Sequence, residues 1–209
     1  MSPAHPLAVG IDVAARRGCD VVTLDDALVA RPVGRPHTAD DLRMLLAPLA
    51  PGVIAIDAPP AWAASGRTRS CERALMARGI SVFATPDATR GGASSFYDWM
   101  RTGFEMFAGA RPCPTLETFP HAVAIALRGR APEHGLLKRP AAKMAWRRDA
   151  LDAAGVDHGA LRTIDEIDAA LCAVTGRWFL EGRTVALGDP DEGVLTVPVG
   201  LPDRPATGP

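Results

Sequence analysis

Two short apolar segments that each end in an aspartate constrain the fold of this chain more than any other feature. "LAVGID" ends at Asp12, and "GVIAID" ends at Asp57. Apolar runs of this length, bounded by turn residues, are typical of β-strands buried in a sheet. A buried carboxylate is unfavourable unless another group pairs with it. Each aspartate is therefore either a turn residue at the end of a strand or part of a functional site.

The order of the segments predicts an α/β fold with a mixed sheet. Three short apolar or alternating runs come first and predict an antiparallel meander: residues 7–13, 20–24 and 27–33. A helix is expected over residues 38–50, with Thr38 as its N-cap, and the strand that ends at Asp57 follows it. A helix-linked strand after a meander gives a mixed sheet with helices packed on it.

The rest of the chain alternates between helical patterns and short strand candidates. Helices are predicted over residues 69–79, 94–109, 121–129, 140–154 and 163–181. Short strands are predicted over residues 81–85 and 114–119, and a closing hairpin over residues 183–198.

Length and composition indicate one folded domain without a membrane span. The chain has 209 residues, for which we expect a single domain over residues 1–202 and a mobile tail over residues 203–209. Its formal net charge of −1 gives no global attraction to nucleic acid or to an anionic membrane. The N-terminus has no secretory pattern, and no apolar segment reaches the roughly 20 residues that span a bilayer. We therefore expect a cytoplasmic protein with no membrane partner.

Further acids stand at positions where burial is expected. Glu117 lies inside the apolar run "PTLETF", and its alternative role is an ion pair with one of the many arginines. In the helix predicted over residues 163–181, Asp165 has a simple role in the first turn, where it favours the helix dipole. Asp168 has no such explanation, because it borders the apolar face that carries Ile167.

These acids predict a divalent metal site if they converge at one edge of the sheet. Carboxylate oxygens are the ligands that Mg²⁺ or Mn²⁺ prefers, and such ions leave positions open for water and phosphate. The candidate catalytic residues are Asp12, Asp57, Glu117 and Asp168, and the candidate metal ligands are Asp12, Glu117, Asp165 and Asp168. Two ions in such a site would hold a phosphodiester between them.

Basic residues supply candidate contacts to a phosphate-bearing substrate. Residues 128–148 carry seven lysines and arginines against the single acid Glu133, and a smaller basic segment surrounds residues 67–78. The candidate phosphate or substrate contacts are Arg67, Arg69, His121, Lys138, Lys143 and Arg147. The alternative is a solvated helix face, or a purely structural role in which arginines such as Arg67 and Arg69 pair with the acids.

The motifs also resemble a known family in their order along nearly the whole chain. They are "VGIDVAAR", "AIDAPPAW", "RTRSCERALMARGI", "LETFPHAV", "LLKRPAAKMAWRRDAL", "DEIDAALCAVTG" and "DEGVLTVP". This set resembles the domain-of-unknown-function family 429, described as predicted nucleases with an RNase H-like fold. The resemblance implies that Asp12 is the metal-binding acid of the first strand. It also implies that Asp168 is the acid of the C-terminal helix, as in the Holliday-junction resolvase branch, while Asp57 and Glu117 compete for the middle position.

Two functions of different classes follow from these observations. The first is a Mg²⁺- or Mn²⁺-dependent phosphodiester hydrolase that acts on nucleic acid or a nucleotide. The second is a non-catalytic module that retains the RNase H-like fold and binds a ligand or nucleotide. Sugar kinases share this fold but normally duplicate the domain, and 209 residues leave room for one copy.

Overall fold

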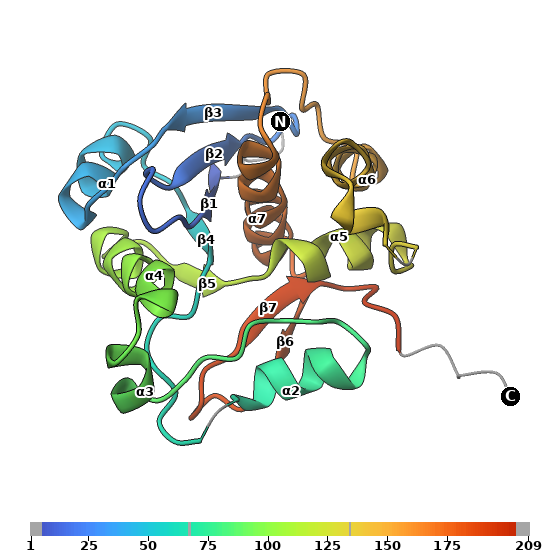
Figure 1. Cartoon of the computed structure of the whole chain (residues 1–209). Helices are drawn as coiled ribbons and strands as arrows, with labels where there is room; N and C mark the ends of the chain where they lie inside the picture. Colours follow the sequence, from blue (N-terminus) through green and yellow to red (C-terminus); the bar gives the residue numbers. More distant parts are fainter. Residues whose placement is uncertain (1–5, 67, 134, 204–209) are drawn as a thin grey trace, which may run out of the picture.

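A five-stranded mixed sheet with helices on both faces forms the centre of the protein (Figure 1). The computed structural model describes residues 6–66, 68–133 and 135–203. The sheet strands are β1 (Ala8–Asp12), β2 (Asp20–Leu24), β3 (Ala30–Gly34), β4 (Val53–Asp57) and β5 (Thr115–Glu117). A separate antiparallel hairpin consists of β6 (Thr184–Leu187) and β7 (Leu195–Pro198). The helices are α1 (Ala39–Leu46), α2 (Ser70–Ala77), α3 (Ala88–Gly92), α4 (Asp98–Gly109), α5 (Pro120–Arg128), α6 (Pro140–Ala153) and α7 (Ile164–Leu180), with 3₁₀ turns η1 (Ser95–Tyr97) and η2 (Leu136–Lys138).

The sheet has the strand order β3-β2-β1-β4-β5. The first three strands are antiparallel neighbours, whereas β4 runs parallel to β1 and β5 runs parallel to β4. A three-strand meander followed by helix-linked parallel strands is the arrangement predicted from the sequence, so the predicted mixed sheet is confirmed.

Alternation along the central strands divides the core into two layers. Val9, Ile11, Ile54 and Ile56 face one side of the sheet and pack with residues of α1 and α4 such as Leu42. The other side is covered by α7, with α5 and α6 beyond it (Figure 1). Helices on both faces exclude water from β1 and β4, which explains why these strands are continuous apolar runs.

Gly10 lets α7 lie directly against β1. A Cβ atom at position 10 would lie 1.9 Å from the carbonyl oxygen of Ala169 and 2.3 Å from the amide nitrogen of Ala173. Both atoms belong to the backbone of α7, so no side-chain rotation relieves the overlap. The small residues Ala8, Gly10 and Ala55 on this face therefore set the distance between the helix and the sheet.

Most predicted elements are present, and the predicted strand over residues 81–85 is wrong. This segment has no regular secondary structure, because the Thr85 N–H and hydroxyl donate to the Glu72 carboxylate and not to a neighbouring strand. Thr38 caps α1 as predicted. Of the tail predicted over residues 203–209, only residue 203 lies within the described ranges. No helix within those ranges is both long and apolar enough to cross a membrane.

Gly10→Ala should lower the free energy of unfolding by about 3 kcal/mol, because overpacking a rigid backbone contact forces α7 away from the sheet. Urea denaturation measures this difference. Gly92→Ala is the matched control, since a Cβ there meets nothing within 4 Å, and its effect should stay within about 0.5 kcal/mol. Equal stability of the two variants would contradict the close packing at Gly10.

Candidate functional site

Asp12 and Asp57 are neighbours at the ends of two parallel strands. They are direct register partners, and each is the last residue of its strand, β1 or β4. Partners on adjacent parallel strands lie about 4.8 Å apart and point to the same face of the sheet. That face also carries Gly10, so both carboxylates are on the side covered by α7.

Helix α7 adds a third carboxylate to this pair. Asp168 immediately precedes Ala169, whose carbonyl lies over Gly10, and so the close packing of α7 on β1 brings Asp168 to the same end of the sheet. The capping box between Thr163 and Glu166 fixes where the helix begins. Asp12 and Asp168 are each only 8% exposed. The acid predicted on the packing face of the helix is therefore buried.

Burial is the largest of the effects that raise the pKa of all three carboxyl groups. For Asp12, burial has the largest effect, and the charges of Asp57 and Asp168 add to it. Burial and then the charge of Asp168 raise the pKa of Asp57 to about 8, although Asp57 retains some exposed surface. Burial also raises the pKa of Asp168, against the opposing effect of Arg147. Three buried acids with raised pKa values at one end of the sheet form a candidate functional site.

Two arginines form ion pairs with acids of this group or with the nearby Asp165. Arg17, in the turn after β1, bonds Asp165 and lies 3.8 Å from Asp12. The guanidinium of Arg17 lowers the pKa of Asp165. The pKa values of the other three acids are raised. On the other side, the Nε atom of Arg147 lies 2.7 Å from Oδ1 of Asp168. That contact is not aligned as a hydrogen bond, since neither atom has a hydrogen-bond partner among the described residues.

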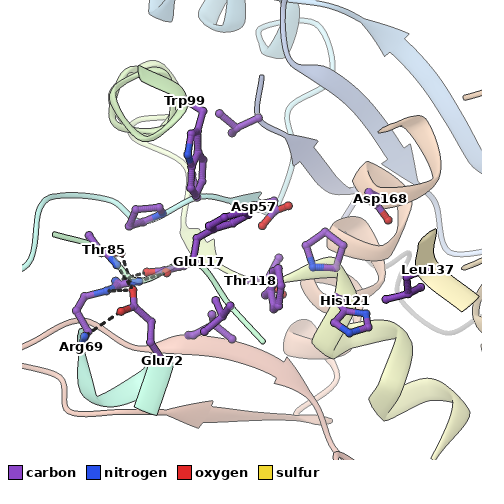
Figure 2. Close-up of a pocket in the computed structure, with 18 of the residues that line it drawn as sticks. Asp57, Arg69, Glu72, Thr85, Trp99, Glu117, Thr118, His121, Leu137 and Asp168 are labelled. Atoms are coloured by element: carbon purple, nitrogen blue, oxygen red, sulfur yellow. Dashed lines mark hydrogen bonds and ion pairs between the residues drawn. The ribbon is translucent and has the colours of Figure 1, made fainter. Parts of the chain in front are cut away.

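A cavity of about 550 Å³ opens beside Asp57 and Asp168 (Figure 2). Its lining combines these acids with Lys143, Arg147 and His121 at one end. Aromatic and apolar side chains from the segment after α2 and from the start of α4 complete it. The cavity is of the size that takes a small ligand.

The structure places Glu117 in a different environment from Asp57. Glu117 is the register partner of Ile56, so it points to the opposite face of the sheet from Asp57. The position level with Asp57 is Thr118, whose hydroxyl donates to Thr175 of α7 at 3.2 Å.

Glu117 belongs to a buried ion-pair network with Arg69 and Glu72. Arg69 donates to both carboxylate oxygens of Glu117, at 2.8 and 2.5 Å, and to Glu72 at 3.0 Å (Figure 2). Glu72 also accepts from the N–H and hydroxyl of Thr85. Burial raises the pKa of Glu117, and the Arg69 guanidinium opposes this shift. In this conformation Arg69 is committed to carboxylates and not to a phosphate, which matches the alternative of an arginine paired with an acid.

Some of the other predicted phosphate or substrate contacts line the cavity, and others do not. Lys143, Arg147 and His121 line the cavity. Burial and then the charges of Arg147 and Lys143 lower the pKa of His121 to about 4, so its ring is neutral at pH 7. Lys138 is exposed in η2 and is not part of the lining. Arg67 lies outside the described residues.

The donor set of Asp12, Asp57 and Asp168 fits a divalent cation by its chemistry. All ligand atoms are carboxylate oxygens, as Mg²⁺ and Mn²⁺ prefer. Oδ1 of Asp168 is buried without a hydrogen-bond partner, and no hydrogen bond or ion pair joins the Asp57 side chain to another described residue. Among the residues that the structure describes, no three acids, histidines or cysteines are placed so that they could hold one ion.

Comparisons with known proteins give a structural neighbour and no family. No family model matches the chain, and no curated protein matches it. Among solved structures, it is similar to "Thermus thermophilus RuvC structure" with 17% sequence identity and a TM-score of 0.45. The match covers 84% of this chain and 96% of that chain.

Sequence reasoning missed the aromatic part of the cavity. Phe83, Phe96 and Trp99 line it together with the acids. The pattern "SVFAT" predicts a strand, in which Phe83 would be an ordinary core residue. The buried partner of Thr85, Glu72, is the signal that could have identified a fixed loop, but its pairing depends on tertiary structure.

Asp57→Asn should stabilise the metal-free protein at alkaline pH. Because the folded pKa of Asp57 exceeds its unfolded value, the folded state binds more protons between about pH 4 and pH 8, and stability falls as pH rises through that window. We expect the variant to equal the wild type near pH 4 and to be more stable by about 1 kcal/mol at pH 8. Denaturation in EDTA across this range measures the difference.

The exposed Asp26 supplies the control for that comparison, since Asp26→Asn should show the same pH dependence as the wild type. A variant at position 57 that is no more stable than the wild type at pH 8 would mean that the three carboxylates do not repel one another.

Arg69→Met should cost about 3 to 5 kcal/mol of stability, because it leaves Glu117 and Glu72 buried without their cation. Adding Glu117→Gln to Arg69→Met should recover part of this loss. Arg73→Met is the matched control, as Arg73 is exposed and pairs with Glu192 at 3.3 Å, and it should cost less than about 1 kcal/mol. Thermal and urea denaturation report both values, and similar losses for the two arginines would refute the buried network.

Proposed function

We propose that this protein is a Mg²⁺- or Mn²⁺-dependent phosphodiester hydrolase acting on nucleic acid or a nucleotide. The observation that carries the proposal is the meeting of Asp12, Asp57 and Asp168 at one end of the sheet, with raised pKa values, beside a cavity that Lys143 and Arg147 also line. The resemblance of the sequence motifs to domain-of-unknown-function family 429 supports the same conclusion.

In this proposal Asp57, and not Glu117, is the middle ligand. Asp57 is level with Asp12 on the α7 face, whereas Glu117, which also lines the cavity, is not level with Asp57 and is bonded to Arg69. Asp12, Asp57 and Asp168 are the residues that would hold the cation. Asp165 would hold Arg17 beside the site. Bound there, a divalent ion would activate water for attack on phosphorus and stabilise the leaving oxygen.

Two basic side chains of α6 are placed to neutralise a phosphate. Arg147 lines the cavity, and its Nη1 atom is buried without a hydrogen-bond partner among the described residues. Lys143 lies one turn earlier on the same helix and also lines the cavity. Arg147 would donate to phosphate oxygens as negative charge grows on them. Neutral His121 adds a hydrogen-bonding group without charge.

Asp12→Asn, Asp57→Asn and Asp168→Asn should each reduce Mn²⁺-dependent cleavage of DNA or RNA on the order of 100-fold, because each removes a ligand of the ion that stabilises the transition state. Gel assays with single-stranded and duplex substrates measure the rates. The exposed Asp40, on the opposite layer in α1, provides the control variant Asp40→Asn, with an unchanged rate.

Glu117→Gln, assayed where circular dichroism shows that it is folded, should keep its rate within about tenfold. A 100-fold loss at Glu117 with little loss at Asp57 would reverse the assignment of the middle ligand. No cleavage by the wild type, combined with stabilisation by a nucleotide, would favour the non-catalytic binding module.

A further inference from the structure

Three aromatic side chains form one wall of the cavity beside the acids, and we call Phe83, Phe96 and Trp99 the aromatic wall. Phe83 comes from the irregular segment after α2, Phe96 from η1 and Trp99 from the first turn of α4. The ring centroids of Phe83 lie 5.9 Å from Phe96 and 6.2 Å from Trp99. Figure 2 shows Trp99 and Asp57 in the same part of the cavity.

The aromatic wall is more exposed than the fold requires. Phe83 is 63% exposed and Phe96 is 58% exposed, so these rings contribute little to the core. Isolated exposed apolar residues are common, but clustered aromatic rings beside a polar cavity mark a binding surface. Large rings left in water gain free energy when a flat partner covers them.

Hydrogen bonds and ring packing hold the aromatic wall in place. Two residues after Phe83, the Thr85 N–H and hydroxyl both donate to Glu72, which is itself bonded to Arg69. Phe96 packs edge-to-face on Tyr97 at 5.0 Å. The buried network that removes Arg69 from phosphate binding thus fixes the loop that carries Phe83. A rigid surface loses little entropy when it binds a ligand.

The basic residues of the lining also limit what the occupant can be. Lys143 and Arg147 favour an anion, while the aromatic wall favours a flat, uncharged ring. A nucleotide carries both groups a few bonds apart, and a cavity of about 550 Å³ is of the size that takes such a ligand.

We propose that the aromatic wall stacks an unpaired nucleobase whose phosphate lies beside Asp57 and Asp168, a role that rests on the hydrolase function proposed above. Both faces of a base inside a duplex are covered by its neighbours, so only a single-stranded, extruded or free nucleotide can occupy the wall. The protein therefore prefers unpaired nucleotides over duplex.

The test compares a short single-stranded oligodeoxynucleotide with an abasic oligonucleotide of the same length. Fluorescence anisotropy in Ca²⁺, which prefers oxygen ligands, measures binding. Phe83→Ala and Phe96→Ala should each weaken binding of the base-bearing strand about tenfold and leave binding of the abasic strand unchanged. Phe179→Ala is the matched control, because Phe179 is also exposed but is not part of the cavity lining.

Equal losses for both strands, or no loss for either, would overturn the stacking role, as would duplex binding with the same dependence on Phe83. Binding of a mononucleotide is measured as well. If the mononucleotide binds as tightly as the strand and its binding depends on Phe83, the ligand is a free nucleotide. If the strand binds more tightly, the ligand is a polynucleotide. Base-dependent binding without cleavage would contradict only the hydrolase proposal. Cleavage that is indifferent to Phe83 and to the bases would contradict only the stacking proposal.

Discussion

The close approach of α7 to β1 over Gly10 is the contact on which the candidate site depends. Gly10 removes the only atom that would separate the helix backbone from the strand. As a result, a carboxylate of the last long helix lies near two carboxylates at the ends of β1 and β4, although about 110 residues separate Asp57 from Asp168 in the sequence. The free energy gained by packing the two elements offsets the repulsion among the three acids.

The cavity combines two charge systems of opposite character. Burial raises the pKa of Asp12, Asp57 and Asp168, and nearby carboxylates add to the shift, although Arg147 and Lys143 oppose it at Asp57 and Asp168. Arg69, Glu72 and Glu117 instead satisfy one another with aligned hydrogen bonds. A satisfied network stabilises the loop behind it, whereas an unsatisfied group favours the binding of a cation. The hydrogen bonding of the acids, and not their number, therefore distinguishes the structural network from the candidate functional site.

The sequence was sufficient to predict the mixed sheet, because apolar runs, caps and turns are local signals. It also indicated Asp168, since an acid on an apolar helix face conflicts with its surroundings. It could not distinguish Asp57 from Glu117, because that difference lies in the register of β5 against β4, where Thr118 and not Glu117 is level with Asp57. The loop that carries Phe83 was predicted as a strand because its fixing partner, Glu72, is on another element.

Diffraction from crystals of the protein soaked in Mn²⁺ tests the central claim most directly, because anomalous scattering locates the ion without reference to activity. The account predicts an anomalous peak among the carboxylates of Asp12, Asp57 and Asp168, with Glu117 still bonded to Arg69. A peak at Glu117, or no peak at the ends of β1 and β4 at saturating Mn²⁺, would contradict it.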